Sequence, residues 1–100
     1  MTRYAKRVDD NHKEVVEGIR AALPEATVCD LSGSGKGVPD LLVGYAGRNF
    51  LLEIKDGAKS PSRRDLTDAQ KTFHCRWQGQ VAIATSAAGA IAAILRTLTQ

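Results

Sequence analysis

The chain has 100 residues and a formal net charge of +3 at pH 7, and 43% of its residues are hydrophobic. This length predicts one domain with a single modest core, and the slight basic excess permits nucleic-acid binding without demonstrating it. We expect a cytoplasmic protein, because there is no apolar run long enough to cross a membrane, no signal-peptide core, and no CxxC spacing between Cys29 and Cys75.

The first predicted helix follows a basic segment, residues 1–8, that either contacts phosphate or is simply solvated. Asp9 or Asp10 is expected at the N-cap, and the helix should end near Leu23, because Pro24 follows. Its apolar stripe has five members: Val15, Val16, Ile19, Ala22 and Leu23.

Two polar residues of this helix are candidates for a site. His12 precedes Val15 and Val16 at helical spacing, which places it on the buried stripe, whereas Glu14 falls on the other side. Two interpretations stay open. Either one of them serves a site, or His12 is a hydrogen-bonded core histidine and Glu14 a solvated charge.

A strand is predicted over Ala26–Leu31, followed by the glycine-rich loop Ser32–Gly37. The loop superficially resembles a phosphate-binding loop, but it fails the Walker pattern because Gly37 follows the lysine. It is either a flexible loop at the mouth of a site, with Lys36 near a nucleic-acid backbone, or a plain linker.

Two further strands are predicted over Asp40–Ala46 and Phe50–Lys55, joined by a turn at Gly47–Asn49. Their apolar runs, residues 41–43 and 50–52, indicate strands that are buried on both faces.

Three charged residues interrupt this apolar stretch: Asp40, Glu53 and Lys55. Glu53 and Lys55 point to the same side of their strand, and the hairpin should bring Asp40 beside them. A buried charge is costly unless it is paired or binds a metal. Carboxylate oxygens suit Mg²⁺ or Mn²⁺, and a neighbouring lysine can orient or deprotonate water. The alternative is a turn-capping Asp40 and a surface Glu53–Lys55 pair on an edge strand.

The segment after Lys55 is polar and basic, and its cations are candidates for contacts with the phosphates of a nucleic-acid substrate. A solvated loop is the alternative. Thr67–Trp77 is the next predicted helix, and Thr67-x-x-Gln70 fits a capping box. Gln70 shares a face with Phe73 and Trp77, so it can also point toward Lys55; both roles stay open. Phe73 and Trp77 are expected in the core rather than stacked on bases.

Gly79 should end that helix, and Gln80–Thr85 is predicted as a strand. Ser86 is expected to cap a last helix, from Ala87 to about Leu98. The resulting order is helix, three strands, helix, strand, helix. It predicts an α/β fold in which three strands form a meander and the fourth joins them in parallel in a mixed sheet.

Pro39-Asp40, followed a dozen residues later by Glu53-Ile54-Lys55, resembles the signature of the PD-(D/E)xK nucleases. Together with Gly37–Val43 and Leu66-Thr67-x-x-Gln70, it is similar to the VRR-NUC branch, often found as small standalone phage proteins. The resemblance extends from about Asn11 to Ile94. It implies one VRR-NUC-like domain over residues 1–100, with a restriction-endonuclease-like core, αβββαβ and a C-terminal helix.

The resemblance also implies an activity: divalent-metal-dependent DNA endonuclease, leaving a 5′-phosphate and a 3′-hydroxyl. The catalytic residues would be Asp40, Glu53, Lys55 and Gln70. The ligands of Mg²⁺ or Mn²⁺ would be Asp40, Glu53, the Ile54 carbonyl and, by residue type, Glu14 of the first helix, although His12 holds the inward position. The DNA contacts would come from Lys36, Lys59, Arg63 and Arg64.

The size of the chain leaves little room for base readout. We therefore expect structure-specific recognition of branched DNA such as a four-way (Holliday) junction. A homodimer, expected mainly from the resemblance, would supply two active sites for paired nicks, and a phage-encoded member would act in the host cytoplasm. The alternatives are a DNA-binding module without catalysis and a nuclease subunit that acts only with a partner.

Overall fold

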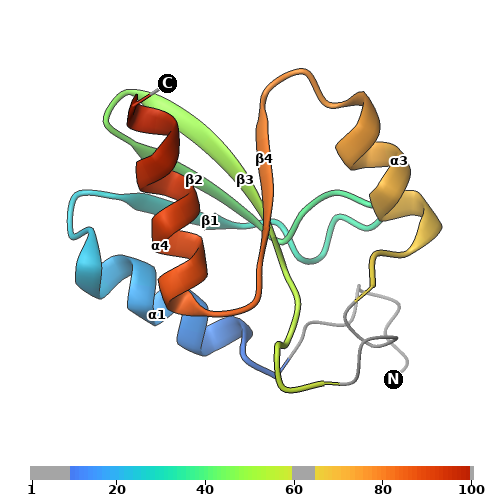
Figure 1. Cartoon of the computed structure of the whole chain (residues 1–100), viewed down its shortest axis with the longest axis horizontal. Helices are drawn as coiled ribbons and strands as arrows, with labels where there is room; N and C mark the ends of the chain where they lie inside the picture. Colours follow the sequence, from blue (N-terminus) through green and yellow to red (C-terminus); the bar gives the residue numbers. More distant parts are fainter. Residues whose placement is uncertain (1–9, 60–64, 100) are drawn as a thin grey trace.

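The structure is a computed structural model, and it describes residues 10–59 and 65–99. Within them the predicted order of elements is confirmed (Figure 1): α1 (His12–Ala22), β1 (Thr27–Asp30), β2 (Leu41–Tyr45), β3 (Arg48–Ile54), α3 (Asp68–Arg76), β4 (Gln80–Ala84), α4 (Ala87–Arg96) and the 3₁₀ turn η1 (Thr97–Thr99). The predictions for residues 1–8, Asp9, Arg63 and Arg64 lie outside the described residues.

The four strands form one mixed sheet in the order β1-β2-β3-β4. β1, β2 and β3 are a meander of antiparallel neighbours, and β4 runs parallel to β3 after the crossover through α3, as predicted. The chain is therefore an α/β domain. None of the helices in the described ranges is long and apolar enough to cross a membrane.

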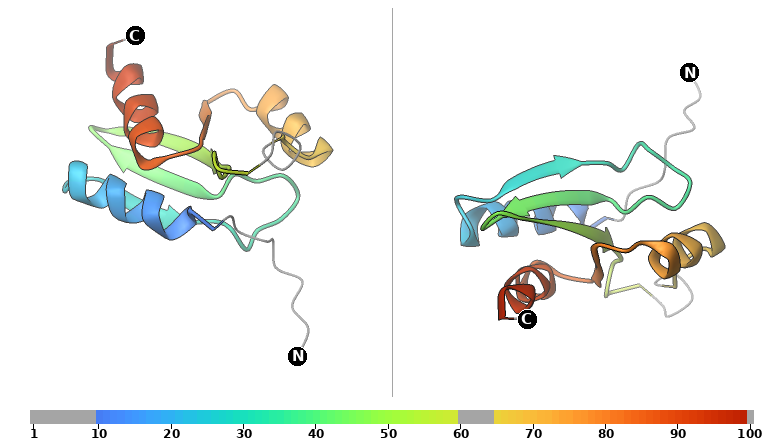
Figure 2. Two further views of the ribbon diagram at one scale, coloured as in Figure 1. Left: turned by 60° about the horizontal axis from the view of Figure 1, so that its bottom comes forward. Right: turned by 90° about the horizontal axis from the view of Figure 1, so that it is seen from above.

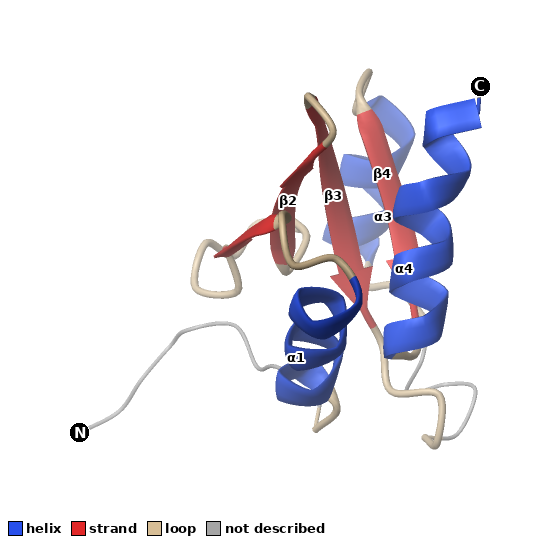
Figure 3. Cartoon of the chain, turned by 90° about the vertical axis from the view of Figure 1, so that its left-hand side faces the viewer, coloured by secondary structure: helices blue, strands red, loops and turns tan. Residues whose placement is uncertain are grey.

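The helices lie on both faces of the sheet. α1 and α4 pack together on one face, and α3 lies on the other, beyond β4 in Figures 1 and 3. The alternation of β3 shows the same division, because Phe50, Leu52 and Ile54 belong to the core with α1 and α4, whereas Glu53 contacts α3. β3 is buried on both faces from Phe50 onward, as predicted, while burial in β2 is incomplete.

The main core lies between the sheet and the pair α1 and α4. Its buried members come from α1, from the sheet and from α4: Val15, Ile19, Leu23, Leu41, Val43, Phe50, Leu52, Ile54, Ala84, Ala90, Ala93 and Ile94. The alanines on α4 bring that helix close to its neighbours. This core holds the strand ends in place, and the polar residues discussed below extend from those ends.

The turn between β2 and β3 differs from the prediction. It consists of Ala46 and Gly47, with φ of 53° and 75°, and Tyr45 pairs with Arg48. Positive φ at both central residues is the geometry that matches the twist of a two-residue hairpin. The predicted turn at Gly47–Asn49 is therefore wrong.

This shorter turn sets the register that matters for the site. A turn at residues 47–49 would pair Ala46 with Phe50 and bring Asp40 opposite Asp56. In the observed register Leu41 pairs with Leu52, so Asp40, one residue further, lies opposite Glu53. The predicted closeness of Asp40 to Glu53 thus follows from a turn other than the predicted one.

The helix caps are partly as predicted. Thr67 and Gln70 form the predicted capping box, and the Ser86 side chain accepts a hydrogen bond from the Gly89 amide at the start of α4. The predicted cap of α1 is wrong, because Asn11 and not Asp10 occupies the N-cap position, and its side chain makes no capping hydrogen bond.

Candidate functional site

Four polar side chains are buried at the α3 end of the sheet. Asp40, Glu53, Lys55 and Gln70 have exposed fractions of 2%, 1%, 8% and 5%. They are the buried polar and charged residues of the described part of the chain, and they come from three separate segments: the loop before β2, the end of β3 and the start of α3. Burial of charged groups is costly, so their convergence at one place needs a specific explanation.

Asp40 fixes the end of β3. Its Oδ2 accepts a hydrogen bond of 2.8 Å from the Ile54 amide, while its own carbonyl accepts one of 2.7 Å from Leu31. The N–H and C=O of one strand residue face the same side, so the Ile54 carbonyl also faces the side on which Asp40 lies. The predicted third oxygen ligand is thus on the correct edge of the strand.

Glu53, Gln70 and Lys55 form a hydrogen-bonded chain. Gln70 Nε2 donates to Glu53 Oε2 at 3.1 Å, and Lys55 Nζ donates to Gln70 Oε1 at 2.9 Å. Lys55 Nζ is also 3.9 Å from Glu53 Oε2. The orientation of the amide follows from its neighbours, because an ammonium can only donate and a carboxylate can only accept.

Gln70 serves two structures at once. Its Oε1 also accepts a hydrogen bond from the Thr67 backbone N–H at 2.9 Å, and the Gln70 backbone N–H donates to Thr67 Oγ1 at 3.2 Å. These two bonds are the capping box of α3. The sequence left a capping role and a site-supporting position open, and the structure combines them in one side chain.

The loop before β2 also packs closely against α3. Gly37 has a φ of 81°, and a Cβ at this position would lie 2.2 Å from the Ala69 carbonyl oxygen. Only glycine allows this conformation at such close approach. Gly37 therefore sets the path of the backbone that leads through Pro39 to Asp40.

The two candidates on α1 lie apart from this cluster. His12 Nε2 is 3.2 Å from Asp30 Oδ2, so His12 is a hydrogen-bonded histidine facing β1, which was one of the two open alternatives. Glu14 is exposed and lines a hollow with Asn11 and Asp56, and no contact among the described residues joins it to the cluster. Its role as a helix ligand stays a prediction.

The neighbours of Asp30 favour its charged form. The pKa of its carboxyl is lowered, first by the hydrogen bond from the Ser32 side chain, and further by the Ser32 amide and His12, which together outweigh the effect of partial burial.

Sequence reasoning missed Asn11. Its Nδ2 donates to the Lys55 carbonyl at 3.3 Å and to the Thr85 carbonyl at 3.1 Å. It thereby joins the start of α1 to the ends of β3 and β4. The signal was present, because a polar amide stands at the point where the resemblance begins, but its residue type suggested only a turn or a cap.

The predicted DNA contacts are placed in part. Lys36 is exposed, with a φ of 58°, beside α3. Lys59 Nζ is 2.8 Å from Asp10 Oδ2. Arg63 and Arg64 fall outside the described ranges.

The donor set fits a hard divalent cation. Asp40 and Glu53 supply carboxylate oxygens, and the Ile54 carbonyl faces the same edge, which matches the oxygen preference of Mg²⁺ and Mn²⁺. Across residues 10–59 and 65–99, no three His, Cys, Asp or Glu side chains gather into one group. Two carboxylates with backbone, water and phosphate oxygens would complete the shell that Mg²⁺ prefers.

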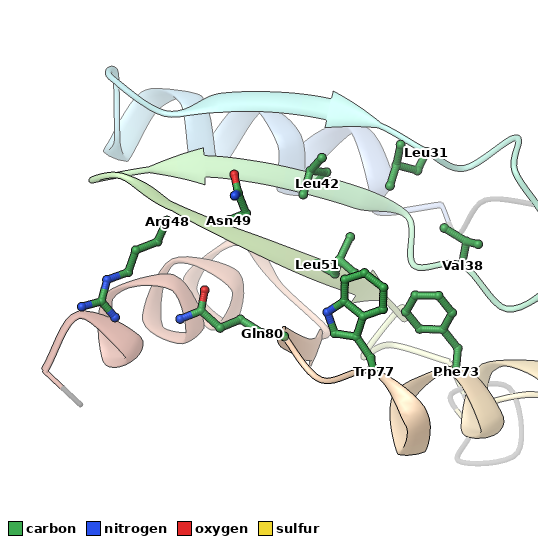
Figure 4. A pocket seen from close by; sticks show the side chains of 10 residues that line it. Leu31, Val38, Leu42, Arg48, Asn49, Leu51, Phe73, Trp77 and Gln80 are labelled. Atoms are coloured by element: carbon green, nitrogen blue, oxygen red, sulfur yellow. The ribbon is translucent and has the colours of Figure 1, made fainter.

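Trp77 is exposed, which corrects the expectation that it belongs to the core. Its side chain is 45% exposed and stacks on Phe73, with ring centroids 5.2 Å apart and an interplanar angle of 15°. Both rings line a hollow between α3 and the sheet (Figure 4). This hollow separates the two rings from the sheet and leaves much of the indole open to solvent.

Comparison of the chain with models of known protein families, with curated proteins and with solved structures found no match.

Proposed function

We propose that this chain is a divalent-metal-dependent DNA endonuclease of the PD-(D/E)xK type, with a restriction-endonuclease-like core similar to the VRR-NUC branch. One observation carries the proposal: Asp40 and Glu53 lie opposite each other at adjoining strand ends, buried, with Lys55 and Gln70 bonded into the same cluster. An ordinary surface pair on an edge strand would be solvated, and β3 is an inner strand.

Asp40, Glu53 and the Ile54 carbonyl would hold Mg²⁺ or Mn²⁺. A divalent cation bound there supplies charge neutralisation at the phosphate and makes an adjacent water more acidic. The protein contributes a rigid frame, because Asp40 is fixed by the Ile54 amide and Glu53 by the Gln70 amide group.

Lys55 would act on the attacking water. Its ammonium is held by Gln70 and lies near Glu53, so it can orient the water or accept its proton after losing its own, and it can neutralise charge that develops on the phosphate. Water attacks phosphorus, the bond between phosphorus and the 3′ oxygen breaks, and the leaving oxygen takes a proton. The products are a 5′-phosphate and a 3′-hydroxyl.

Gln70 would be a positioning residue. It touches both Glu53 and Lys55 and is itself fixed by the capping box. When α3 is formed, Gln70 therefore holds the Lys55 ammonium and the Glu53 carboxylate in a fixed position relative to each other.

The substrate would be recognised by its structure, with a four-way junction as the first candidate, and a homodimer would place two sites for paired nicks. The test is cleavage of a labelled panel: single strand, duplex, splayed arm, flap and four-way junction. Each DNA is incubated with Mg²⁺, Mn²⁺ or EDTA, using wild type, Lys55→Ala and the matched control Lys13→Ala. Lys13 is an exposed lysine on α1 with no assigned role.

We expect metal-dependent cutting by wild type and by Lys13→Ala, and its loss in Lys55→Ala. Circular dichroism checks that all three proteins are folded. If wild type binds the DNA but cuts none of the panel with either metal, the isolated chain is not a nuclease, and a binding module or a partner-dependent subunit becomes the better interpretation.

A further inference from the structure

A largely apolar groove runs between α3 and the sheet, separate from the buried cluster. It has a volume of about 950 Å³. Its apolar walls include Leu42 and Leu51 from the sheet and Phe73 and Trp77 from α3 and its C-cap (Figure 4). Arg48 and Gln80 lie at the end of the groove nearer the β2–β3 turn. A second hollow of about 530 Å³ adjoins it and shares Phe73 and Trp77.

The rim of these two hollows is basic. Arg48 lines the first, Lys36 and Arg76 line the second, and no Asp or Glu lines either of them among the described residues. Such a surface complements a polyanion. It also disfavours a second copy of the chain in the groove, because both copies would bring the same group of cations into one contact.

The stacked rings of Trp77 and Phe73 form an exposed aromatic surface of the kind on which bases stack. Trp77 is supported by Phe73, and a Cβ at Gly79 would lie 2.7 Å from the indole Nε1, so the absence of a side chain there leaves room for the ring. An aromatic ring beside cations is the combination by which proteins hold single-stranded nucleic acid.

The groove lies on the same face of the sheet as the candidate active site. Leu51 and Glu53 are two residues apart on β3 and therefore face the same side of the sheet. On α3, Gln70 contacts the cluster, while Phe73 and the C-cap residue Trp77 line the groove. Seven residues of helix correspond to about 10 Å, roughly three steps of a stacked strand.

We propose that this groove binds unpaired nucleotides of the strand that is cut, with a base stacked on Trp77 and the phosphates beside Lys36 and Arg76. The inference rests on the proposed function, because the active site holds the same strand about three nucleotides away. A base inside a duplex is already stacked on both of its faces, so only an unpaired or splayed base can offer its face to the indole. The preferred substrate would then carry a single-stranded segment or an open branch point next to the scissile bond.

The test uses Trp77 as its own probe, because the chain contains one tryptophan. Fluorescence is titrated with short oligothymidylate, and with a blunt duplex of matched length, at low salt and in EDTA so that no DNA is cut. Variants without the indole are followed by the anisotropy of labelled oligothymidylate: Trp77→Ala, Trp77→Phe, and the control Leu95→Ala, an exposed apolar residue on α4.

We expect saturable quenching by oligothymidylate and little by the duplex. Trp77→Ala should weaken oligothymidylate binding by about 5- to 150-fold, the range measured for loss of one base-stacking aromatic, with Trp77→Phe retaining most of the affinity and Leu95→Ala all of it. Lack of quenching, or equal quenching by the duplex, would overturn the proposal. So would a fluorescence change on raising the protein concentration without DNA, because it would show a second copy in the groove.

The two proposals can fail separately. Quenching without cleavage by any metal would remove the nuclease and leave the groove as a single-strand site. Metal-dependent cleavage without quenching would leave the nuclease and remove the groove.

Discussion

Alternate residues of β3 divide between two different environments. Phe50, Leu52 and Ile54 face α1 and α4, where the described side chains are apolar and tightly packed. Leu51, Glu53 and Lys55 face α3, where a polar cluster adjoins a partly open groove. Figure 2 shows how α4 and α3 take separate positions around the same strands. The comparison teaches that one face is an apolar core, whereas the other face buries charged groups at a cost in free energy.

The largest expected effect is on activity, from the α3 face. Asp40→Asn keeps an oxygen that can accept the Ile54 amide but removes the carboxylate charge, so the protein should fold while binding Mn²⁺ poorly. Cleavage should fall by about 10³-fold or more, since a catalytic metal supplies several kcal/mol. Cleavage rates and Mn²⁺ calorimetry measure both effects. Asp68→Asn, on the exposed start of α3, is the control, and equal activity of the two variants would refute the assignment.

A substitution in the apolar core should instead lower the stability of the fold. Leu52→Ala, on the core face and 1% exposed, should lower the free energy of unfolding by about 2–5 kcal/mol. Leu51→Ala, on the opposite face, should cost less, because Leu51 lines the groove and lies outside the main core cluster. Urea denaturation compares the two. Equal costs would mean that the two faces are packed alike.

A third prediction concerns the backbone of the glycine-rich loop that packs against α3. Gly37→Ala introduces a Cβ that conflicts with the Ala69 carbonyl at a φ of 81°. We expect a loss of stability of about 1–3 kcal/mol, the range for a strained backbone position. Gly33→Ala is the matched control, because nothing lies within 4 Å of a Cβ there. Thermal unfolding of both variants provides the measurement. Equal midpoint temperatures would show that the loop does not pack tightly against α3.

The smallest expected effect concerns Asp30 at the end of β1. Its pKa is lowered in the folded protein, so its contribution to stability is present above its unfolded pKa, near 3.8, and is lost as the pH falls through the lower folded pKa. The side chain is 57% exposed, so the contribution after screening by solvent should be below about 1 kcal/mol. Urea midpoints of wild type and Asp30→Asn should differ near pH 6 and should begin to converge only when the pH falls below 3.8. A constant difference would contradict the assignment.

The sequence predicted the order of elements and the sheet because apolar periodicity and caps are local signals. It also predicted that Asp40 lies beside Glu53 and Lys55, because strand alternation and hairpin pairing determine which side chains share a face, whereas it left Gln70 open between a helix cap and this cluster. The turn was misplaced because Ala46 is an unusual residue at positive φ.

Other features depend on tertiary packing that no local pattern contains. Asn11 makes its hydrogen bonds to residues far along the chain, and its local sequence suggests only a turn or cap. Trp77 is exposed because a hollow separates its ring from the sheet, and a helical wheel gives the face of a residue but not the distance to what that face covers.

The double use of Gln70 has a thermodynamic consequence. The same Oε1 accepts from the Thr67 amide and from Lys55, so unwinding the first turn of α3 also releases the ammonium and the Glu53 carboxylate. Local opening of the helix and assembly of the polar cluster are therefore one equilibrium. Any ligand that binds only the assembled cluster must also slow amide hydrogen exchange through this opening of α3, by a free energy of RT ln(1 + [L]/Kd).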